Sequence, residues 1–421
     1  MGSAKRDVVI VGGGIMGLMT AYFLTHKGAS VTVLEKGRLP CGSSCGNAGL
    51  IVPSHLQPLC SPANLKEGFR HLFNPVGPFS VSLTGDGRRL LWLARFAAHC
   101  TEAHVARAVC VYRDLADRSL VLHDALAELG GSHYEYGRHG LLCVYASKKG
   151  FQAACEEAEA LCRAGRPARV LEADALRCLE PSLADAVVGG ILQEPDGSLN
   201  PSAFMTWLAQ RVRDQGGQIA EETEVFGAEV SQGRVVRLRT NRGPVAGEQF
   251  VVAAGAWTGI LTGRMGVRLP VEPAKGFSIT YEAPLDALRH PLLLEEARVA
   301  VTPMEGTLRL AGVLELSGFD DAVPLRRLDA MERDLTTFLP SLGRLAVREI
   351  WRGFRPCTPD GLPVIGRLRS PKNLLVGSGH ATKGMFLGPV TGELLAEFLE
   401  GRSPAPSVER AVDPNRFAHL F

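Results

Sequence analysis

The sequence lacks the features that would mark a membrane span, a cleavable signal or a zinc site. No apolar run in its 421 residues reaches the ~18–20 residues that cross a bilayer. The first apolar run, residues 8–11, is too short for a signal peptide and continues directly into glycines. The 10 cysteines include no C-x-x-C pair and no His/Cys cluster at zinc spacing. We therefore expect no bound metal. The cysteines are expected to be free thiols of a cytoplasmic protein, and Cys41 and Cys45 to be small side chains in a turn.

Charge of one sign is also missing. The chain has 46 Lys and Arg against 44 Asp and Glu, a net charge of +2, and its basic residues are scattered. A protein that binds nucleic acid needs a basic stripe on its surface, so nucleic acid is not expected as a partner. With 46% hydrophobic and 21% charged residues, the chain has the composition of a globular protein with a substantial core. Its length predicts two or three domains, or one large fold with an inserted module.

One segment, residues 65–83, scatters large apolar side chains among basic ones. Two interpretations of it are open: a face that docks on the inner surface of a membrane, or a loop and helix packed on the core. We favour the packed loop and helix. The protein is then cytoplasmic, and a peripheral position on the inner face of the membrane is the alternative.

The first 35 residues are typical of a βαβ unit. A β-branched run at residues 7–11 and a second one at 30–34 enclose residues 18–24, whose apolar positions recur at helical spacing. Because two strands joined through a helix lie parallel, this pattern predicts the start of a parallel sheet.

Three glycines follow the first strand in the order G-x-G-x-x-G. Gly12 allows a tight turn, Gly14 lets a pyrophosphate approach the backbone, and Gly17 lets the helix pack on the strand. The helix N-terminus adds free N–H groups and a positive dipole end. Glu35 follows the last glycine by 18 residues, where a carboxylate accepts hydrogen bonds from ribose hydroxyls and repels a phosphorylated ribose. The pattern predicts a bound dinucleotide.

Two further glycine-rich segments favour FAD over NAD. Residues 42–49 (GSSCGNAG) are a small-residue loop whose hydroxyls and N–H groups suit the underside of a flat tricyclic ring. Residues 377–384 (GSGHATKG) precede a helix and supply amides suited to the negative charge that collects at N1 and C2=O of a reduced flavin. The buried strand at 249–255 ends in Gly255, as happens where a cofactor crosses a sheet edge.

The rest of the chain alternates helical and strand patterns, and its ends predict one nucleotide-binding domain interrupted by an antiparallel sheet. Helices are expected at residues 88–99, 108–129, 148–164, 201–213, 325–338 and 390–400. Strands are expected at residues 140–145, 189–194, 220–230, 235–240, 276–282, 298–303, 307–314 and 373–377, and a loop rich in Pro and Gly at 353–366.

These motifs resemble those of the FAD-dependent D-amino acid oxidase superfamily, which includes glycine oxidase, monomeric sarcosine oxidase and bacterial D-amino acid dehydrogenase. The resemblance covers nearly the whole length and is closest to the dehydrogenase branch, with D-hydroxyproline dehydrogenase also similar. It rests on GSSCGNAGLIVP, PAKGFSIT, RVAVT followed by LRLAGVLELSGF, WRGFRPCTPDGLPVIG and NLLVGSGHATKGM. The middle helices are matched loosely.

The resemblance implies an α/β fold with a Rossmann-like FAD-binding domain of the glutathione reductase type. Beside it lies a discontinuous α+β substrate domain built on an antiparallel sheet. We expect the FAD-binding domain to comprise residues 1–90, 195–262 and 351–421. The substrate-binding domain is expected to comprise residues 91–194 and 263–350.

The resemblance also implies which residues bind FAD, from the glycine turn, the end of the second strand and the two glycine-rich loops, with one strand residue acting through its backbone. The residues assigned to the cofactor are Gly12, Gly14, Ile15, Met16, Gly17, Glu35, Lys36, Ser43, Ser44, Asn47, Ala48, Gly49, Leu50, Val225 (backbone), Gly255, Gly353, Gly379, His380, Ala381, Thr382, Lys383, Gly384 and Met385. Sarcosine oxidase attaches its flavin through a cysteine, and the corresponding position here is Gly353. Cys357 is four residues away, so we expect noncovalent FAD.

An amino acid substrate needs its carboxylate fixed at two points, which the planar fork of arginine does best. Arg355 occupies the position that binds substrate carboxylate in glycine oxidase, and Arg352 is expected to point away. Lys383 stands where the sarcosine oxidase branch has a lysine that helps hold the carboxylate; the alternative is a lysine that satisfies nearby carbonyls. Tyr281 either donates to the carboxylate from the opposite wall or belongs to the core. His55 either faces the pocket or caps a turn, and we favour the turn.

The activity implied is oxidative deamination of D-amino acids, with D-proline or hydroxy-D-proline as possible substrates. Hydride passes from the α carbon to flavin N5 and leaves an imine. The partners expected are a small amino acid and an electron acceptor, either a quinone-type compound or oxygen. The alternatives are a glycine or sarcosine oxidase, and a flavoprotein subunit of a multi-subunit electron-transfer dehydrogenase; an oligomer or partner subunits stay open.

Overall fold

The computed structural model describes residues 7–71, 77, 79–81, 87–163 and 165–420. Its N-terminal unit is the predicted βαβ, made of β1 (Asp7–Val11), α1 (Ile15–His26) and β2 (Ser30–Leu34). Along β1, Val8 and Ile10 enter the hydrophobic core on one face of the sheet, while Val9 enters the core on the other. β1 is therefore buried on both faces, as parallel strands usually are.

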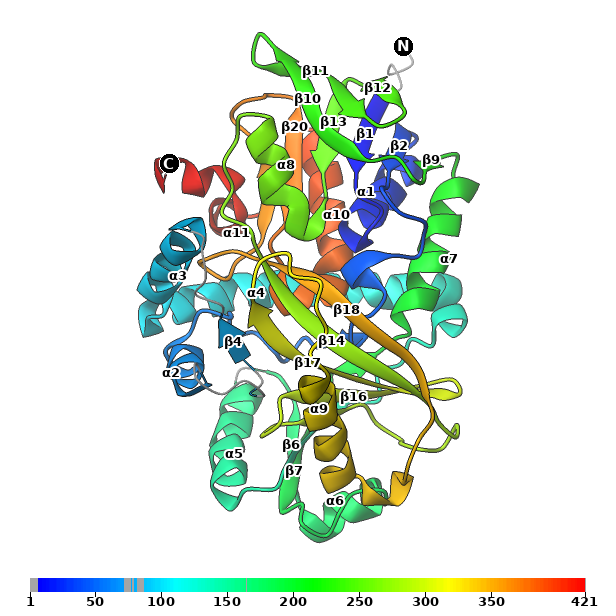
Figure 1. Ribbon diagram of the computed structural model, residues 1–421, viewed down its shortest axis with the longest axis vertical. Coiled ribbons are helices and arrows are strands. Elements are labelled where there is room, and N and C mark those ends of the chain that lie inside the picture. Colours follow the sequence, from blue (N-terminus) through cyan, green and yellow to red (C-terminus); the bar gives the residue numbers. More distant parts are fainter. Residues whose placement is uncertain (1–6, 72–76, 78, 82–86, 164, 421) are drawn as a thin grey trace.

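A six-stranded sheet carries the glycine turn, in the order β19-β20-β13-β1-β2-β9. All neighbours run parallel except β19, which is antiparallel to β20. Figure 1 shows how this order brings the blue N-terminal strands, the green middle strands and the orange C-terminal strand together. The strands that complete the sheet are β9 (Gln218–Ala220), β13 (Gln249–Val252), β19 (Val364–Arg367) and β20 (Leu374–Ser378).

Helices cover one face of this sheet, and a small sheet with one helix covers the other. α1, α4, α7 and α10 share a core with β1 and β2 on the first face. On the second face, α8 and the antiparallel strands β10, β11 and β12 pack over β1 and β13. The bounds are α4 (Glu102–Gly130), α7 (Pro201–Asp214), α8 (Thr258–Arg264), α10 (Gly384–Leu399), β10 (Val225–Ser231), β11 (Arg234–Thr240) and β12 (Gly243–Ala246).

A second, larger sheet lies below the first in Figure 1, and its strands follow the order β18-β14-β17-β16-β15-β5-β7-β6, with β4 beside β17. Most pairs are antiparallel, as predicted, but β15 with β5 and β17 with β4 are parallel. α9 (Leu325–Phe338) packs on one face of this sheet. The strands are β4 (Phe79–Val81), β5 (Leu141–Tyr145), β6 (Ala168–Glu172), β7 (Gly189–Gln193), β14 (Glu272–Glu282), β15 (Leu292–Leu294), β16 (Val299–Met304), β17 (Thr307–Leu316) and β18 (Val347–Cys357).

The remaining elements are short or peripheral. They are β3 (Leu50–Ile51), β8 (Gly197–Ser198), α2 (Pro62–His71), α3 (Gly87–His99), α5 (Lys148–Arg163), α6 (Ala173–Leu179) and α11 (Pro406–Val412). No helix in the described part of the chain is both long enough and apolar enough to cross a membrane. The cysteines are free, and Cys45 donates through its thiol to the carbonyl of Cys41, which agrees with the predicted turn.

Two expectations about segments need correction. The loop predicted at residues 353–366 is partly strand, because β18 pairs along the whole of β14 down to Cys357. Pro356 is tolerated there because β18 is an edge strand, whose outer N–H groups need no partner in the sheet. α4 was expected in the substrate domain, yet it packs in the same core as α1 and α10. Its apolar stripe, not its position in the chain, decides where it packs.

The segment 65–83 falls partly outside the described residues, namely at 72–76, 78 and 82–83. Its first part belongs to α2, and residues 79–81 form β4, which pairs with β17. Leu65, Phe79 and Val81 pack against a core cluster that includes Trp92 of α3. The described part of this segment is thus a helix and a strand that pack on the second sheet, and one side of the helix is exposed.

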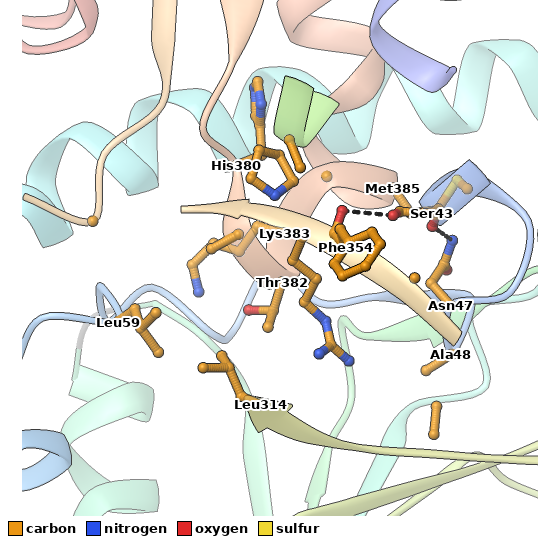
Figure 2. Close-up of a pocket in the computed structure, with 18 of the residues that line it drawn as sticks. Ser43, Asn47, Ala48, Leu59, Leu314, Phe354, His380, Thr382, Lys383 and Met385 are labelled. Carbon is orange, nitrogen blue, oxygen red and sulfur yellow. Dashed lines mark hydrogen bonds between the residues drawn. The ribbon is translucent and has the colours of Figure 1, made fainter. Parts of the chain in front are cut away.

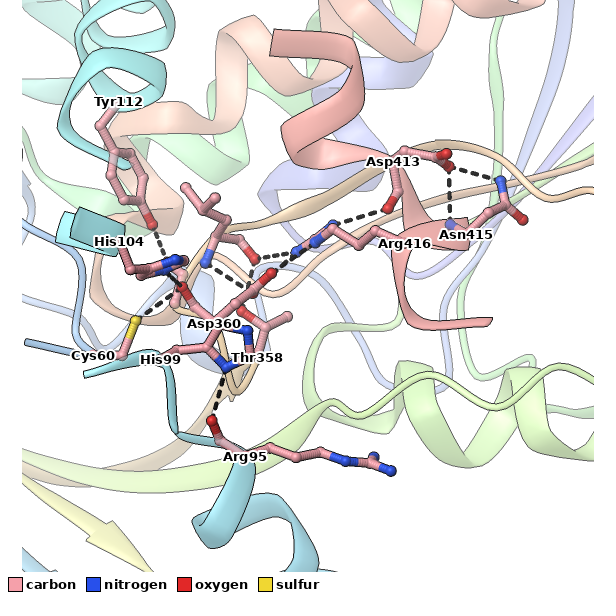
Figure 3. Close-up of polar contacts among 12 residues, drawn as sticks. Cys60, Arg95, His99, His104, Tyr112, Thr358, Asp360, Asp413, Asn415 and Arg416 are labelled. Atoms are coloured by element: carbon pink, nitrogen blue, oxygen red, sulfur yellow. Dashed lines mark hydrogen bonds and ion pairs between the residues drawn. The ribbon is translucent and has the colours of Figure 1, made fainter. Parts of the chain in front are cut away.

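The loop between β18 and β19 is fixed by a buried polar network around Asp360 (Figure 3). Arg416 donates to both carboxylate oxygens of Asp360, at 2.7 and 3.1 Å. The Asp360 carbonyl accepts from His104 Nε2 at 2.8 Å, and the Tyr112 hydroxyl donates to the neighbouring carbonyl of Gly361. Side chains of α4 and of the C-terminal segment therefore hold this loop beside the region described next.

Candidate active site

A cavity of about 1790 Å³ lies between the carboxyl ends of the parallel strands and the second sheet. It exceeds the roughly 300–1,000 Å³ of an ordinary ligand pocket, so it has room for a dinucleotide and a substrate together. The predicted cofactor and substrate residues line it with three exceptions, Gly17, Gly379 and Tyr281. Figure 2 shows part of this cavity, with Lys383 and Thr382 on one side and Leu59 and Leu314 near them.

Two of the three turn glycines are required by backbone packing. Gly12 has a φ of +110°, and a Cβ there would lie 2.4 Å from the carbonyl oxygen of Ala253. A Cβ on Gly17 would lie 1.8 Å from the carbonyl oxygen of Gly12, so only glycine lets α1 approach the turn. Gly14 lies between them and faces the cavity. Gly12 and Gly17 have the packing roles that their spacing predicts, and the role of Gly14 beside a pyrophosphate stays a prediction.

The N-terminus of α1 opens on the cavity and is suited to an anion. Its first turn carries no acidic residue, and its cap, Gly14, has no side chain to occupy the free N–H groups. The N–H of Ile15 donates to the hydroxyl of Ser44 at 2.9 Å, which ties the loop after β2 to the helix. The dipole and the remaining N–H groups of the first turn favour a phosphate there.

Glu35 is buried at the end of β2 with its carboxylate already oriented. One carboxylate oxygen accepts from the N–H of Gly13 at 2.7 Å, and the other accepts from the N–H of Gly37 at 2.9 Å. Each oxygen keeps acceptor capacity for a further donor such as a ribose hydroxyl. Lys36 lines the cavity next to it, with its ammonium 3.4 Å from the centroid of the Trp257 ring.

The loop 42–49 is shaped by its own polar side chains. Asn47 donates to the carbonyls of Ser43 and Ser44, at 3.1 and 3.0 Å, and accepts from the N–H of Gly49 at 2.8 Å. The Ser43 hydroxyl donates to the carbonyl of Phe354 on β18 at 2.7 Å, a contact drawn in Figure 2. In the structure these two side chains hold the loop in place. Their predicted contacts with FAD remain predictions.

The sequence reasoning missed three residues that hold this loop from behind: Ser278 on β14, Thr302 on β16 and Arg309 on β17. Each donates a hydrogen bond to a carbonyl of residues 45–48. They lie more than 200 residues from the loop in the chain. The only signal in the sequence was Arg309, a charged residue inside an apolar strand pattern.

The second glycine-rich loop, residues 377–384, contains an imidazole with one buried nitrogen that has no partner among the described residues. Nε2 of His380 lies 2.8 Å from the Thr391 hydroxyl, while Nδ1 is buried without a hydrogen bond in the described part of the chain. Burial lowers the pKa of His380 to about 3, so the ring is neutral. His380 lines the cavity, but Nδ1 itself has almost no exposed surface there.

Arg355 places a positive charge in the cavity wall without an acidic partner among the described residues. Its Nη1 donates to the carbonyl of Val313 at 2.7 Å, and the guanidinium lies across Gly276, where a Cβ would come within 2.0 Å of it. Burial lowers the pKa of Arg355. Arg352 pairs with Asp321 instead and does not line the cavity, as predicted; the two arginines are three residues apart on β18, so they point to opposite faces. The guanidinium of Arg355, which has no acidic partner among the described residues, is suited to bind the carboxylate of a ligand.

Lys383 adds a second basic group to the same cavity. Its ammonium lies 5.1 Å from the centroid of the Tyr112 ring, and burial lowers the pKa of Lys383 to about 8. His55 also lines the cavity, with Nε2 2.8 Å from Oε1 of Gln193, and its N–H closes a turn on the carbonyl of Val52 at 3.1 Å, so His55 has both of the positions that were left open for it. Burial, with a smaller effect from the charge of Lys383, lowers the pKa of His55 to about 4.

Tyr281 does not reach the cavity. Its hydroxyl donates to Glu332 on α9 at 2.8 Å, and its ring packs in the core of the second sheet. Successive side chains of a strand point to opposite faces, and Ser278 on the same strand already points toward the loop 42–49. Tyr281 therefore faces α9, and its proposed contact with a substrate carboxylate is withdrawn.

The cysteine nearest the tethering position also lies away from the cavity. Gly353 lines the cavity, whereas the Cys357 side chain is fully buried in a core cluster with Trp92 and Phe96. Burial raises the pKa of Cys357 to about 12, so its thiol is protonated. No thiolate at this place can attack a bound ring.

Taken together, a glycine turn at a helix N-terminus, an oriented carboxylate at the end of β2 and a cavity shared with a second sheet define a dinucleotide-dependent enzyme. The free N–H groups at the start of α1 and the size of the cavity fit FAD.

Comparison with known proteins agrees with this class. The FAD-dependent oxidoreductase family (DAO) matches residues 7–398, and the chain belongs to that family. D-amino acid dehydrogenase of Rhizorhabdus wittichii is 31% identical over 412 residues, covering 94% of this chain and 97% of that protein. The dehydrogenase of Agrobacterium fabrum is 29% identical over 410 residues, with 94% and 96% covered. The predictions of family, FAD and amino acid oxidoreductase chemistry are confirmed.

Solved structures share the fold. Glycine oxidase from Bacillus cereus superimposes with a TM-score of 0.78 at 21% identity, covering 97% of this chain and 99% of that one. L-proline dehydrogenase from P. horikoshii gives 0.75 at 21% identity, with 99% and 98% covered. The predicted α/β fold, with a nucleotide-binding sheet beside a second sheet, is confirmed.

Proposed function

We propose that this chain oxidises free D-amino acids at the α carbon. The observation that carries the proposal is Arg355, a half-buried guanidinium that lines the cavity and has no acidic partner among the described residues. An amino acid supplies the missing anion with its carboxylate. The D configuration is taken from the dehydrogenases that the chain resembles over nearly its whole length.

In this mechanism the protein mainly binds and orients the substrate. Bound FAD supplies the two-electron acceptor for the α hydrogen. Arg355 holds the carboxylate at two points, and this fixes the direction of the Cα–H bond. The apolar wall formed by Leu59, Leu314 and their neighbours excludes water from that bond.

The substrate amine must lose its proton before the α hydrogen leaves. Two cationic groups, Arg355 and Lys383, lie in the same cavity wall and disfavour a substrate ammonium, so they lower its pKa. Burial lowers the pKa of His55 to about 4 and that of His380 to about 3, so both rings are weak bases and neither is given the role of taking this proton. The imine product then leaves and hydrolyses in water to a keto acid and ammonia.

A second substrate class is favoured by Lys383. A second cation near the carboxylate site is the feature that the sequence shares with the sarcosine oxidase branch, so secondary amines such as D-proline, hydroxy-D-proline or sarcosine are the second candidates. Measuring which of these compounds reduces the flavin separates the secondary amines from primary D-amino acids.

Anaerobic reduction of the flavin tests the proposal directly. The purified holoenzyme is mixed with D- and L-amino acids, glycine, sarcosine and D-prolines, and bleaching of the flavin absorbance is followed. We expect rapid bleaching by D-amino acids and slow or no bleaching by their L enantiomers. Bleaching only by glycine and sarcosine, or by no amino acid at all, would contradict the proposal.

The natural electron acceptor is proposed to be a quinone-type compound reached at a membrane surface. α2 and α3 share a core cluster at the edge of the cavity; α2 exposes Phe69 (67%), which also lines the cavity, and α3 exposes Leu90 (53%). Lys66 and Arg70 flank Phe69 on the exposed side of α2. Apolar groups bordered by basic ones suit the interface of an anionic bilayer.

Vesicle sedimentation tests this surface. The protein should sediment with vesicles that contain anionic lipid, and the double variant Phe69→Ser, Leu90→Ser should stay in the supernatant. Leu285→Ser is the control, because Leu285 is more exposed (75%) than either residue but lies between β14 and β15, away from α2 and α3. Equal loss of binding in the control, or no binding by the parent protein, would reject the surface.

A further inference from the structure

The loop 42–49 is held by an unusual row of hydrogen bonds to its backbone. Four successive carbonyls, those of residues 45–48, all accept from side chains of the second sheet. Arg309 Nη1 donates to the carbonyls of Cys45 and Asn47, at 2.8 and 3.2 Å. Ser278 donates to the carbonyl of Gly46 at 2.8 Å, and Thr302 donates to that of Ala48 at 2.7 Å.

These bonds determine where the N–H groups of the same peptides point. The peptides are trans, so each N–H points opposite to the carbonyl of the preceding residue. With the carbonyls turned toward the sheet, the N–H groups of Gly46, Asn47 and Ala48 turn toward the cavity that these residues line. None of the three N–H groups has a hydrogen-bond partner within the described residues. Three adjacent donors are therefore available to a ligand.

Arg309 brings a positive charge to this row without entering the cavity. Its side chain is 7% exposed; Nε donates to the Thr280 hydroxyl at 3.0 Å, and Nη2 lies 3.5 Å from a carboxylate oxygen of Glu349. Burial lowers the pKa of Arg309, but an arginine keeps its charge at any physiological pH. A cation bound to a carbonyl polarises the peptide and strengthens its N–H as a donor.

We propose that Arg309 is a positioning residue that turns and polarises these three amides toward the negative charge that FAD gains on reduction. Arg309 acts through the backbone of the loop and does not contact the substrate. Ser278 and Thr302 complete the row as neutral donors. The inference concerns the strength of FAD binding and the flavin potential, and it holds whichever amino acid is the substrate.

The test compares Arg309→Met and Arg309→Lys with the parent protein. We expect the dissociation constant of FAD to rise at least tenfold in Arg309→Met, and the flavin midpoint potential to become more negative. If the substitution weakens binding of reduced FAD tenfold more than binding of oxidised FAD, the midpoint potential falls by about 30 mV for a two-electron couple. Arg309→Lys should recover part of both changes, because a lysine keeps the charge but has a single nitrogen, so it cannot also keep the contacts that Nε makes with Thr280 and Nη2 makes with Glu349.

Arg327→Met is the matched control. Arg327 is also a buried arginine that donates to a carbonyl, that of Gly77 at 2.9 Å, and it pairs with Glu315, but it lies on α9 and does not line the cavity. It should lower thermal stability without moving the flavin potential. An unchanged potential and FAD affinity in Arg309→Met, or an equal shift in Arg327→Met, would overturn the proposal.

Two milder variants keep the test usable if Arg309→Met does not fold. Ser278→Ala and Thr302→Ala each remove one hydroxyl donor from one carbonyl. Both should move the potential in the same negative direction by a smaller amount. A positive shift, or no shift, in both would also reject the role of the row.

Discussion

At the scale of the residue, Arg355 is the side chain on which the proposed chemistry depends. Replacing Arg355 by Ala should remove a charge-assisted bidentate contact and the orientation it enforces, about 3–5 kcal/mol, or two to four orders of magnitude in kcat/KM. FAD content should stay the same, because Arg355 contacts the carbonyl of Val313 and no loop of the nucleotide site. Steady-state kinetics with a bleachable D-amino acid measure the loss.

The control for Arg355 is its neighbour. Arg352→Ala removes a guanidinium that pairs with Asp321 outside the cavity, so it should change kcat/KM by less than about twofold, as expected for an exposed ion pair. Arg355→Lys should recover only part of the lost activity. Turnover near that of the parent in Arg355→Ala would place the carboxylate elsewhere.

Glu35 supplies the second prediction at this scale. Its carboxylate is held by the N–H groups of Gly13 and Gly37, and Glu35→Ala leaves both amides and the ribose hydroxyls without that acceptor. We expect FAD binding to weaken by about 1–3 kcal/mol. Titration of apoprotein with FAD, followed by flavin fluorescence, gives the dissociation constant. A variant that purifies fully loaded and keeps FAD through extended dialysis would refute the ribose assignment.

Lys383 makes the active site sensitive to pH. Its pKa is lowered to about 8, so the charge is present below that pH and is lost as the pH rises through it. An inhibitor with a carboxylate and no amine should therefore bind about tenfold more weakly above pH 8 than below it, if Lys383 is a second anchor. The pH dependence should disappear in Lys383→Met. A flat profile in the parent would leave Arg355 as the only anchor.

At the scale of the element, the loop between β18 and β19 depends on one buried ion pair. Burial alone would raise the pKa of Asp360, but the charge and hydrogen bonds of Arg416 outweigh it and lower that pKa. A carboxyl with a lowered pKa in the folded state adds stability above its ordinary pKa, and this contribution is lost as the pH falls through the folded value.

Asp360→Asn should therefore destabilise the protein by about 3–5 kcal/mol at neutral pH, because it leaves Arg416 buried without its partner. The difference from the parent should shrink as the pH is lowered into the acid range. Urea unfolding at a series of pH values measures it. Asp321→Asn, which breaks the more exposed pair with Arg352, is the comparison and should cost less than about 1 kcal/mol. A constant difference at all pH values would show that the charge of Asp360 is not the cause.

At the scale of the whole molecule, the cavity lies between the two sheets, so bound FAD should stabilise both. We also expect FAD to bind without a covalent bond. The position that carries the tether in sarcosine oxidase is Gly353, and the thiol of Cys357 is buried away from the cavity. Acid precipitation should leave all of the yellow colour in the supernatant, and colour in the pellet would contradict this. Removal of FAD should also lower the Tm, because a ligand at a hundred times its Kd adds about 2.7 kcal/mol.

The features that the sequence determined by itself are local. The βαβ unit, the roles of Gly12 and Gly17 and the carboxylate of Glu35 follow from spacing within 35 residues, and α9 has the bounds that its periodicity predicts. The motifs shared with the family added Arg355 and the loop before α10 to the predicted site. They could do so because each motif fixes the type of side chain at a set distance from its Pro and Gly residues.

What only the tertiary structure decided is long-range pairing. β18 is a strand because β14 supplies its hydrogen bonds, although its Gly and Pro residues predict a loop. Tyr281 faces α9 because strand alternation and the position of Ser278 assign the two faces of β14. Arg309 reaches the carbonyls of residues 45–48 only after the second sheet has formed across the loop. Contacts between residues more than 200 positions apart leave no periodic pattern in a single chain, so the fold had to bring them together first.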